Sequence, residues 1–357
     1  MRDILRDRVP RHMGMEIFNT AKKKQDYFMI NYLNSHNPKV LYIHIPFCVS
    51  KCKYCVCQSY GNRTKEDIAN YVSTVIVPQF EQYARILEDV EFDQLYIGGG
   101  TPTILSCKQL NELLSRIPNI DRIPIKCIEA SPDTLNLDHI NLLKEFSFDF
   151  LSVGIQTISK KLCNKHNRFF LSEDALLQLS SQLRDSGLYI NYDLIAFLDH
   201  GDIRDLPEFR NELRFILDEC RPTSVTIHQL QQSFFSEERS LLLIKLIRDE
   251  LMRSQEYECI NSELLDKDAL YDTVFQAEYR LVRDNRDFHH YMWNKYAGMP
   301  VQGYDILSLG YNTKIHTISN ANTLIYSPGE NKLKQVKFEQ YIYDDYEQIR
   351  LKKGLSK

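Results

Sequence analysis

Short apolar runs alternate with longer amphipathic stretches along the first two thirds of this chain. Runs of this kind are typical of strands that are buried on both faces, and they occupy residues 40–45, 94–97, 125–130, 150–155, 189–195 and 224–229. Helical spacing between them predicts helices at residues 65–86, 107–116, 137–146, 172–186 and 206–219. Thr64, with Asp67 three residues later, is a typical helix start. This alternation predicts an α/β fold, a partial (β/α)6 barrel.

The rest of the chain has weaker patterning. Residues 239–254 and 269–284 have helical spacing, residues 304–318 are rich in strand formers, and the charged tail at 338–357 is expected to be a helix. We therefore predict an N-terminal segment at 1–37, a barrel core at 38–235 and a small C-terminal extension at 236–357.

Composition narrows the possible classes of protein. The chain has 357 residues, 43% of them hydrophobic and 26% charged, which is typical of a globular protein. A net charge of −4 does not indicate a nucleic-acid-binding protein. No apolar run approaches the roughly 18 residues of a membrane span, and the first residues lack an apolar signal core. We expect a cytoplasmic protein with reduced thiols.

The densest chemistry follows the first predicted strand. Four of the nine cysteines, Cys48, Cys52, Cys55 and Cys57, fall within ten residues, and the first three have the spacing C-x3-C-x2-C. Three thiolates on one loop can hold a 4Fe-4S cluster with one iron open, since such clusters are held by cysteine thiolates, usually four. A structural zinc site is the alternative, but zinc needs four ligands, usually in two spaced pairs. Cys57 would close such a site only through a cramped C-x-C chelate. The spacing favours the cluster and leaves zinc open.

Other candidate residues lie at the ends of later strands, where reactive groups belong in a barrel. Gly98, Gly99 and Gly100 follow the second strand, and glycines allow close approach of the backbone to a ligand; a tight turn is the simpler explanation. Glu129 ends the third strand, where it is either a ligand for hydroxyl groups or a helix-capping acid. Arg168 taken alone is a solvated surface charge.

The cysteine spacing, with the aromatic Tyr54 before the last cysteine, is the signature of the radical S-adenosylmethionine enzymes. The wider stretch YIHIPFC…CKYCVC resembles the oxygen-independent coproporphyrinogen III oxidases and their relatives. The resemblance implies a radical S-adenosylmethionine barrel whose 4Fe-4S cluster is ligated by Cys48, Cys52 and Cys55. S-adenosylmethionine would bind the open iron, and an electron from the reduced cluster would cleave it to a 5′-deoxyadenosyl radical. That radical abstracts hydrogen from unactivated carbon.

The same resemblance implies roles for further residues. Tyr42, Gly99 and Glu129 would contact the first S-adenosylmethionine. A second molecule would be held by a larger group: Tyr54, Gly100, Thr101, Gln156, Arg168 and Asp193. Cys57 matches a cysteine of the decarboxylating oxidases, whereas chaperone relatives usually have another residue there. It is therefore either a catalytic group on the substrate side or a small buried thiol.

Two departures from the oxidases affect the expected substrate. Residues 196–200, AFLDH, replace their usual glycine- and proline-containing turn, and the chain is shorter than the oxidases at its C-terminus. Oxidative decarboxylation of porphyrinogen propionates is the leading hypothesis. Methyl transfer or cyclopropanation with two S-adenosylmethionine molecules is the second, and a haem-binding chaperone without turnover is the third. Expected partners are a tetrapyrrole or other small substrate and a flavodoxin or ferredoxin electron donor, with a monomeric chain and no nucleic acid or membrane partner.

Overall fold

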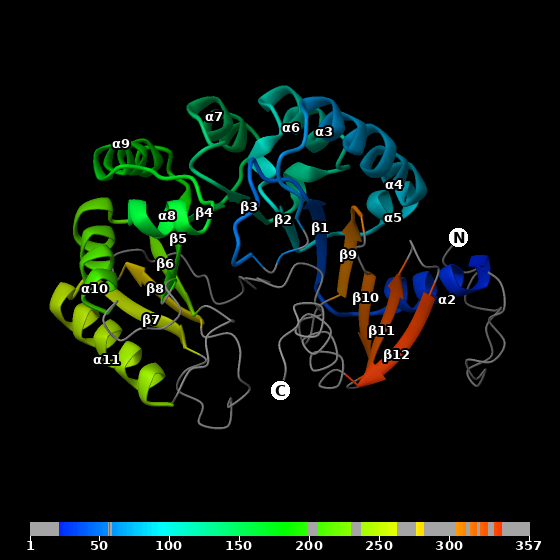
Figure 1. Cartoon of the computed structure of the whole chain (residues 1–357). Coiled ribbons are helices and arrows are strands. Elements are labelled where there is room, and N and C mark those ends of the chain that lie inside the picture. Colours follow the sequence, from blue (N-terminus) through cyan, green and yellow to red (C-terminus); the bar gives the residue numbers. More distant parts are fainter. Residues whose placement is uncertain are drawn as a thin grey trace.

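A twelve-stranded curved sheet organises the molecule, and helices cover its outer face (Figure 1). The structure is a computed structural model, and it describes residues 21–55, 57, 59–196, 198, 206–229, 237–262, 276–281, 305–311, 315–319, 322–327 and 332–337. The strand order is β12-β11-β10-β9-β1-β2-β3-β4-β5-β6-β8-β7. The central strands are β1 (Lys39–Ile45), β2 (Gln94–Gly99), β3 (Ile125–Ala130), β4 (Phe150–Gln156), β5 (Tyr189–Ala196) and β6 (Ser224–Gln229).

Seven of these strands run parallel. The strands β1 to β6 pair in sequence order, and β9 (Asp305–Leu309) joins β1 in the same direction. The six predicted strands are thus confirmed, and a seventh, from the strand-rich stretch 304–318, extends the parallel part of the partial barrel, which was not predicted. Antiparallel strands flank it: β7 (Tyr257–Ser262) and β8 (Gln276–Leu281) beyond β6, and β10 (Ile315–Ser319), β11 (Asn322–Ser327) and β12 (Lys332–Lys337) beyond β9.

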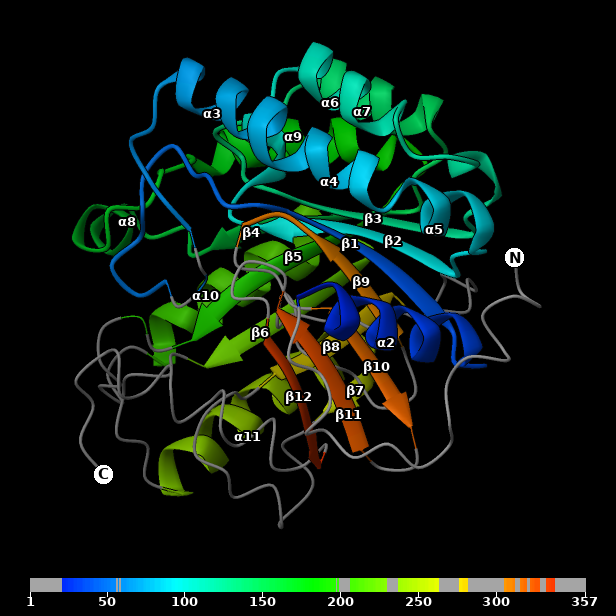
Figure 2. The same cartoon turned by 90° about the vertical axis from the view of Figure 1, so that its right-hand side faces the viewer.

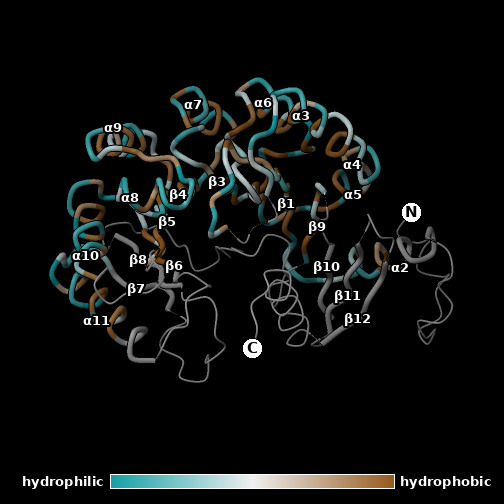
Figure 3. The backbone as a smooth tube through the Cα atoms, in the orientation of Figure 1, coloured by the Kyte–Doolittle hydropathy of each residue, from teal (hydrophilic) through white to brown (hydrophobic). Residues whose placement is uncertain are grey.

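Helices pack along the convex side of the sheet (Figure 2). They are α3 (Lys65–Tyr71), α4 (Val77–Gln82), α5 (Ala84–Asp89), α6 (Cys107–Leu114), α7 (Leu137–Glu145), α8 (Lys160–Lys165), α9 (Glu173–Arg184), α10 (Leu206–Phe215) and α11 (Glu237–Ser254), with α2 (Ala21–Asn34) against β10, β11 and β12. Figure 3 shows hydrophobic and hydrophilic positions alternating along the outer helices. This alternation is typical of helices with one buried face.

The first long predicted helix is correct in place but not continuous. Thr64 and Asp67 form the expected capping box at its start. The helix then widens into a π-helical segment at Val72–Ile76, and Tyr83 interrupts it again. Pro78 lies two residues after the end of the wide segment, and a proline cannot donate the backbone hydrogen bond that would continue a regular helix. The break therefore has a local cause in the sequence.

Two layers of side chains form the core. The larger layer lies between the sheet and the helices, and includes Leu41, Ile43 and Ile97 on the outward-facing strand positions. The smaller layer fills the inside of the barrel, and consists of Val40, Tyr42, Tyr96, Cys127, Phe150, Tyr189 and Ile306. Because side chains alternate between the two faces of a strand, later inward positions such as Glu129 and Asp193 lie on the same inner wall above this layer.

Some expectations about the second half of the chain were wrong or lie outside the described residues. The helix predicted at 269–284 is contradicted, because residues 276–281 pair with β6 and β7 as a strand. Ala277, Tyr279 and Leu281 alternate with polar residues, which fits a strand, but the wider stretch 269–284 was interpreted as helical. The predicted tail helix at 338–357 lies outside the described residues. No helix in the described part of the chain is long and apolar enough to cross a bilayer.

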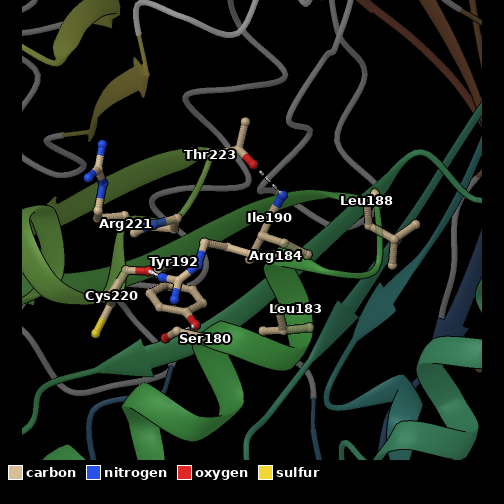
Figure 4. Close-up of a pocket in the computed structure, with 11 residues that line it drawn as sticks. Ser180, Leu183, Arg184, Leu188, Ile190, Tyr192, Cys220, Arg221 and Thr223 are labelled. Atoms are coloured by element: carbon tan, nitrogen blue, oxygen red, sulfur yellow. Dashed lines mark hydrogen bonds between the residues drawn. The ribbon is translucent and has the colours of Figure 1, made fainter.

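A cavity of about 180 Å³ lies at the amino-terminal ends of β5 and β6, away from the cysteine loop (Figure 4). Its polar groups are tied to the protein. Arg184 Nη1 donates to the Cys220 carbonyl oxygen at 2.6 Å, Ser180 Oγ and Tyr192 Oη are 2.7 Å apart, and Ile190 N donates to Thr223 Oγ1 at 3.1 Å. These bonds hold the end of α9 against the barrel.

Candidate functional site

The cysteine loop leaves the carboxyl end of β1 and folds back on itself. Cys48 N donates to the Tyr60 carbonyl oxygen at 3.0 Å, and Cys55 N donates to the Cys52 carbonyl oxygen at 3.1 Å. Phe47 and Tyr60 form an isolated parallel bridge at the base of the loop. These backbone bonds place the loop at the mouth of the barrel, as the sequence predicted.

Each of the three motif cysteines has a polar group beside its sulfur. Thr101 Oγ1 donates to Cys48 Sγ at 3.4 Å, Arg168 Nη1 donates to Cys52 Sγ at 3.9 Å, and Cys55 Sγ lies 3.8 Å from Ser59 Oγ. Hydrogen bonds and positive charge favour thiolates, which are the ligand form of cysteine. Thr101 and Arg168, which the sequence assigned to a second cofactor, therefore also contact the cysteine sulfurs.

Protonation differs among the cysteines. Hydrogen bonding from the Cys57 thiol, with Ser59 adding to it, lowers the pKa of Cys55 to about 6. The same bond to Cys55 raises the pKa of Cys57 well above its ordinary value, and burial raises the pKa of Cys48. Residue Cys57 is exposed, but burial and the charges of Glu129 and Cys48 add to the rise in the pKa of its thiol. The thiol therefore lies close to the motif, and both interpretations of Cys57 stay open.

The donor set fits an iron–sulfur cluster. The charges of Cys52 and Cys55 both act on the Cys48 thiol, so the three sulfurs lie near one another. Within the described residues no group of three His, Cys, Asp or Glu side chains is arranged as the ligands of one metal ion. Three cysteine thiols, each with a polar group beside its sulfur, are the kind of ligand that a 4Fe-4S cluster uses.

The glycine turn after β2 is built against the cysteine loop. Gly100 N donates to the Ile45 carbonyl oxygen at 2.8 Å, and Thr101 N donates to that of Phe47 at 2.7 Å. A Cβ on Gly100 would lie 2.6 Å from the Phe47 carbonyl oxygen, and Gly99 has a φ of +113°. The tight turn is therefore a structural need. The space beside each glycine is occupied by protein atoms, of Tyr96 and Glu129 at Gly98, of His44 at Gly99 and of Phe47 at Gly100.

Glu129 lies across from this turn on β3. Its Oε1 accepts from Tyr96 Oη at 2.6 Å, and its Oε2 accepts from Gly99 N at 3.1 Å. Tyr42 stacks on Tyr96 with ring centroids 5.9 Å apart, and its hydroxyl lies 3.0 Å from His44 Nδ1. Tyr42, Gly99 and Glu129 are thus brought together, as expected for a common ligand. Tyr96, two residues before Gly98 on the same inner face, was not predicted from the sequence as a residue of the site.

The remaining predicted residues divide between the loop and the barrel wall. Tyr54 packs beside His166 with ring centroids 5.5 Å apart. Arg168 joins the cysteine loop to β3 and β4, because Nη2 donates to Ser131 Oγ at 3.0 Å and to the Gly154 carbonyl oxygen. Gln156 follows a bulge in β4 with a φ of +69°. Its Oε1 is buried without a hydrogen-bond partner among the described residues, so it could accept from a ligand.

Asp193 belongs to a polar network on the inner wall of β4, β5 and β6. Its Oδ2 accepts from Ser152 Oγ at 2.7 Å and its Oδ1 from Asn191 Nδ2 at 3.0 Å, while His228 Nε2 lies 3.5 Å from Oδ1. Asn191 Oδ1 accepts in turn from Ser224 and Thr226 on β6. These partners of Asp193 were not predicted from the sequence. Their signal was polar residues at every second position of strands otherwise apolar, at 191 and 193 and at 224, 226 and 228.

Comparisons with known proteins agree with this geometry. The family model for the radical SAM superfamily matches residues 42–213. The chain is 27% identical over 345 residues to the heme chaperone HemW of Buchnera aphidicola (pea aphid strain), covering 90% of this chain and 85% of that protein. It is 32% identical over 165 residues to the oxygen-independent coproporphyrinogen III oxidase of Pseudomonas aeruginosa, covering 44% of this chain and 36% of the oxidase.

A solved structure has the same fold. The coproporphyrinogen III oxidase of Escherichia coli, described as a radical SAM enzyme, superposes with a TM-score of 0.66 at 20% identity, over 84% of this chain and 69% of that one. At this identity the likeness concerns the fold alone. It confirms the radical SAM partial barrel with seven parallel strands.

Proposed function

Since this chain belongs to the radical SAM superfamily, in the group that includes the oxygen-independent coproporphyrinogen III oxidases and the heme chaperone HemW, we propose that it uses a 4Fe-4S cluster and S-adenosylmethionine for oxidative decarboxylation of propionate side chains. The family implies the cluster and S-adenosylmethionine; the residues that hold them, and the substrate, are our assignment. The proposal includes a location of the protein in the cytoplasm, where thiols stay reduced.

Cys48, Cys52 and Cys55 would hold the cluster, with Thr101 and Arg168 stabilising the first two as thiolates. The bound cluster and S-adenosylmethionine together supply a carbon radical that abstracts hydrogen. Glu129 keeps its carboxylate fixed toward the glycine turn through Tyr96, which suits hydrogen bonds to ribose hydroxyls. A second S-adenosylmethionine would use the open acceptor of Gln156 together with Tyr54, Gly100, Thr101, Arg168 and Asp193. Its presence rests on the family resemblance and on that unpaired acceptor.

The Cys57 thiol, hydrogen-bonded to Cys55 beside the motif, is the observation that supports decarboxylation, because the resemblance matches this cysteine to one in the decarboxylating oxidases. It would meet a substrate that reaches the cluster. In the proposed reaction a hydrogen atom would pass from the β-carbon of a propionate to the 5′-deoxyadenosyl radical, which gives 5′-deoxyadenosine. The substrate radical would then lose carbon dioxide and give one electron to a one-electron acceptor, and a vinyl group would remain. In this step the Cys57 side chain would contact the substrate and would not ligate the cluster.

One observation favours a second function. The match to a heme chaperone spans 85% of that protein, whereas the match to the Pseudomonas oxidase spans 36%. A chaperone would bind haem in stoichiometric amount, without consuming S-adenosylmethionine.

Anaerobic reconstitution with iron and sulfide, followed by product analysis, tests the proposal. With dithionite, S-adenosylmethionine and coproporphyrinogen III we expect 5′-deoxyadenosine and carbon dioxide. Cys48→Ala should abolish both, while Cys107→Ala, a half-buried cysteine on α6, should retain them. S-adenosylhomocysteine or methylthioadenosine instead of carbon dioxide would identify methyl transfer. Haem bound one to one with no deoxyadenosine would identify the chaperone.

A further inference from the structure

Charge is distributed unevenly between the surroundings of the cysteine loop and the rest of the chain. Residues 46–65 and 157–171 contain eight lysines and arginines and no aspartate or glutamate. The other residues carry 36 basic and 48 acidic side chains, a net charge of −12. A local excess of one sign on a chain of the opposite net sign indicates a surface for a charged partner.

These two segments form one surface. Lys53 N donates to the His166 carbonyl oxygen at 3.0 Å. Ser50 Oγ donates to the Asn167 carbonyl oxygen at 3.1 Å, and Asn167 Nδ2 donates to that of Lys51 at 3.2 Å. The loop after β1 and α8 lie side by side in two perpendicular views (Figures 1 and 2). Basic side chains from both segments are exposed: Lys51, Lys53, Arg63, Lys65, Lys160, Lys161 and Lys165.

Apolar groups lie among the charges. Val49, Tyr60 and Phe169 are 49%, 40% and 45% exposed, and they are three of the seven large hydrophobic residues exposed in the described part of the chain. Arg63 lies over the Tyr60 ring at 5.6 Å. Exposed aromatic and aliphatic groups with charges at the rim are typical of protein docking sites. These apolar groups would contribute nothing to the binding of a small inorganic anion.

We propose that this basic surface, residues 46–65 with 157–171, docks a small acidic one-electron carrier protein, of the flavodoxin or ferredoxin class. The inference rests on the proposed function, because only a cluster at the loop needs an electron. The loop is also where the motif thiols approach the exterior, since Cys48 and Cys55 are half-buried. On docking, one electron passes from the reduced carrier to the oxidised cluster. The carrier is oxidised by one electron and the cluster is reduced by one.

Charge reversal on this surface tests the proposal. Lys53 and Lys160 are exposed, and neither belongs to the residues proposed to hold the cofactors. The matched control reverses Arg122, just before β3, and Lys144, in the last turn of α7; both are exposed at the opposite, amino-terminal edge of the strands. Binding of oxidised flavodoxin to the anaerobically reconstituted protein is measured by titration calorimetry at several salt concentrations. Iron content and circular dichroism verify that each variant is folded and loaded.

Wild type and R122E/K144E should bind flavodoxin equally, and increasingly weakly as salt rises. K53E/K160E should bind about tenfold more weakly or worse, in line with electrostatic effects on association, while dithionite reduces all three clusters alike. Equal binding by both double variants, binding insensitive to salt, or no binding of flavodoxin or ferredoxin by wild type would overturn the proposal. So would an RNA that binds the surface when the carriers do not. Failure of the proposed function is distinguishable, because dithionite would then yield no deoxyadenosine in wild type.

Discussion

Gly99→Ala tests how closely the glycine turn approaches His44 on β1. A Cβ at this position would lie 2.3 Å from His44 Nδ1, and φ is +113°. The His44 ring cannot easily move aside, because Tyr42 Oη lies 3.0 Å from the same nitrogen and the His44 carbonyl oxygen accepts from Tyr71 at 2.7 Å. A side chain in this backbone region costs about 1–3 kcal/mol, and overpacking costs about 1–3 kcal/mol more. We expect a loss of about 4 kcal/mol in the free energy of unfolding.

Gly187→Ala is the matched control. Gly187 also has a positive φ, +77°, but a Cβ there would have no atom within 4 Å. Only the backbone cost remains, about 1–2 kcal/mol. Urea unfolding followed by circular dichroism measures both variants. Adding His44→Ala to Gly99→Ala should recover the steric part, which a double-mutant cycle isolates. Equal losses for the two glycine variants, or no coupling with His44, would refute the close approach.

Three further outcomes follow from the same contacts. Burial raises the pKa of Glu212 to about 7, above its unfolded value of 4.5, so its contribution to stability is complete below pH 4.5 and is lost as pH rises through 7. Glu212→Gln should remove up to about 3 kcal/mol of this pH dependence. An unchanged slope of stability against pH in urea titrations between pH 5 and 8 would contradict it. Tyr96→Phe removes a donor to Glu129 and should weaken S-adenosylmethionine binding about tenfold for about 1.4 kcal/mol lost; calorimetry giving an unchanged affinity would separate Glu129 from the ligand. Cys57→Ala should leave the iron content unchanged, and loss of iron would make Cys57 a ligand.

The sequence predicted the parts of this molecule that depend on local patterning. Strands β1 to β6 were found because their apolar runs are continuous, and the cysteine loop was placed at the barrel mouth because it directly follows β1. The strand β9 falls in the stretch 304–318 that was expected to be rich in strands, but its place beside β1 was not predicted, because the pairing joins residues more than 260 positions apart, as in Lys39 with Asp305. No local pattern encodes such a pairing.

In the candidate site, too, spacing in the sequence predicted some residues, and tertiary packing supplied the others. Motif residues such as Cys48 and Glu129 could be named from spacing, but not the groups that hold them. Tyr96 and Ser131 contact the candidate residues only after strands have paired and loops have closed. Likewise, His228 reaches Asp193 because β5 and β6 are neighbours in register. These partners are products of tertiary packing, which a single sequence displays only as polar residues at inward strand positions.

The central claim is that Cys48, Cys52 and Cys55 hold a 4Fe-4S cluster with one iron left open for S-adenosylmethionine. Electron paramagnetic resonance of the dithionite-reduced, anaerobically reconstituted protein, recorded with and without S-adenosylmethionine, tests it most directly. The account predicts the signal of a reduced 4Fe-4S cluster that changes when S-adenosylmethionine is added, and its loss in Cys48→Ala but not in Cys57→Ala. A protein that takes up zinc and no iron, or a cluster signal indifferent to S-adenosylmethionine, would contradict it.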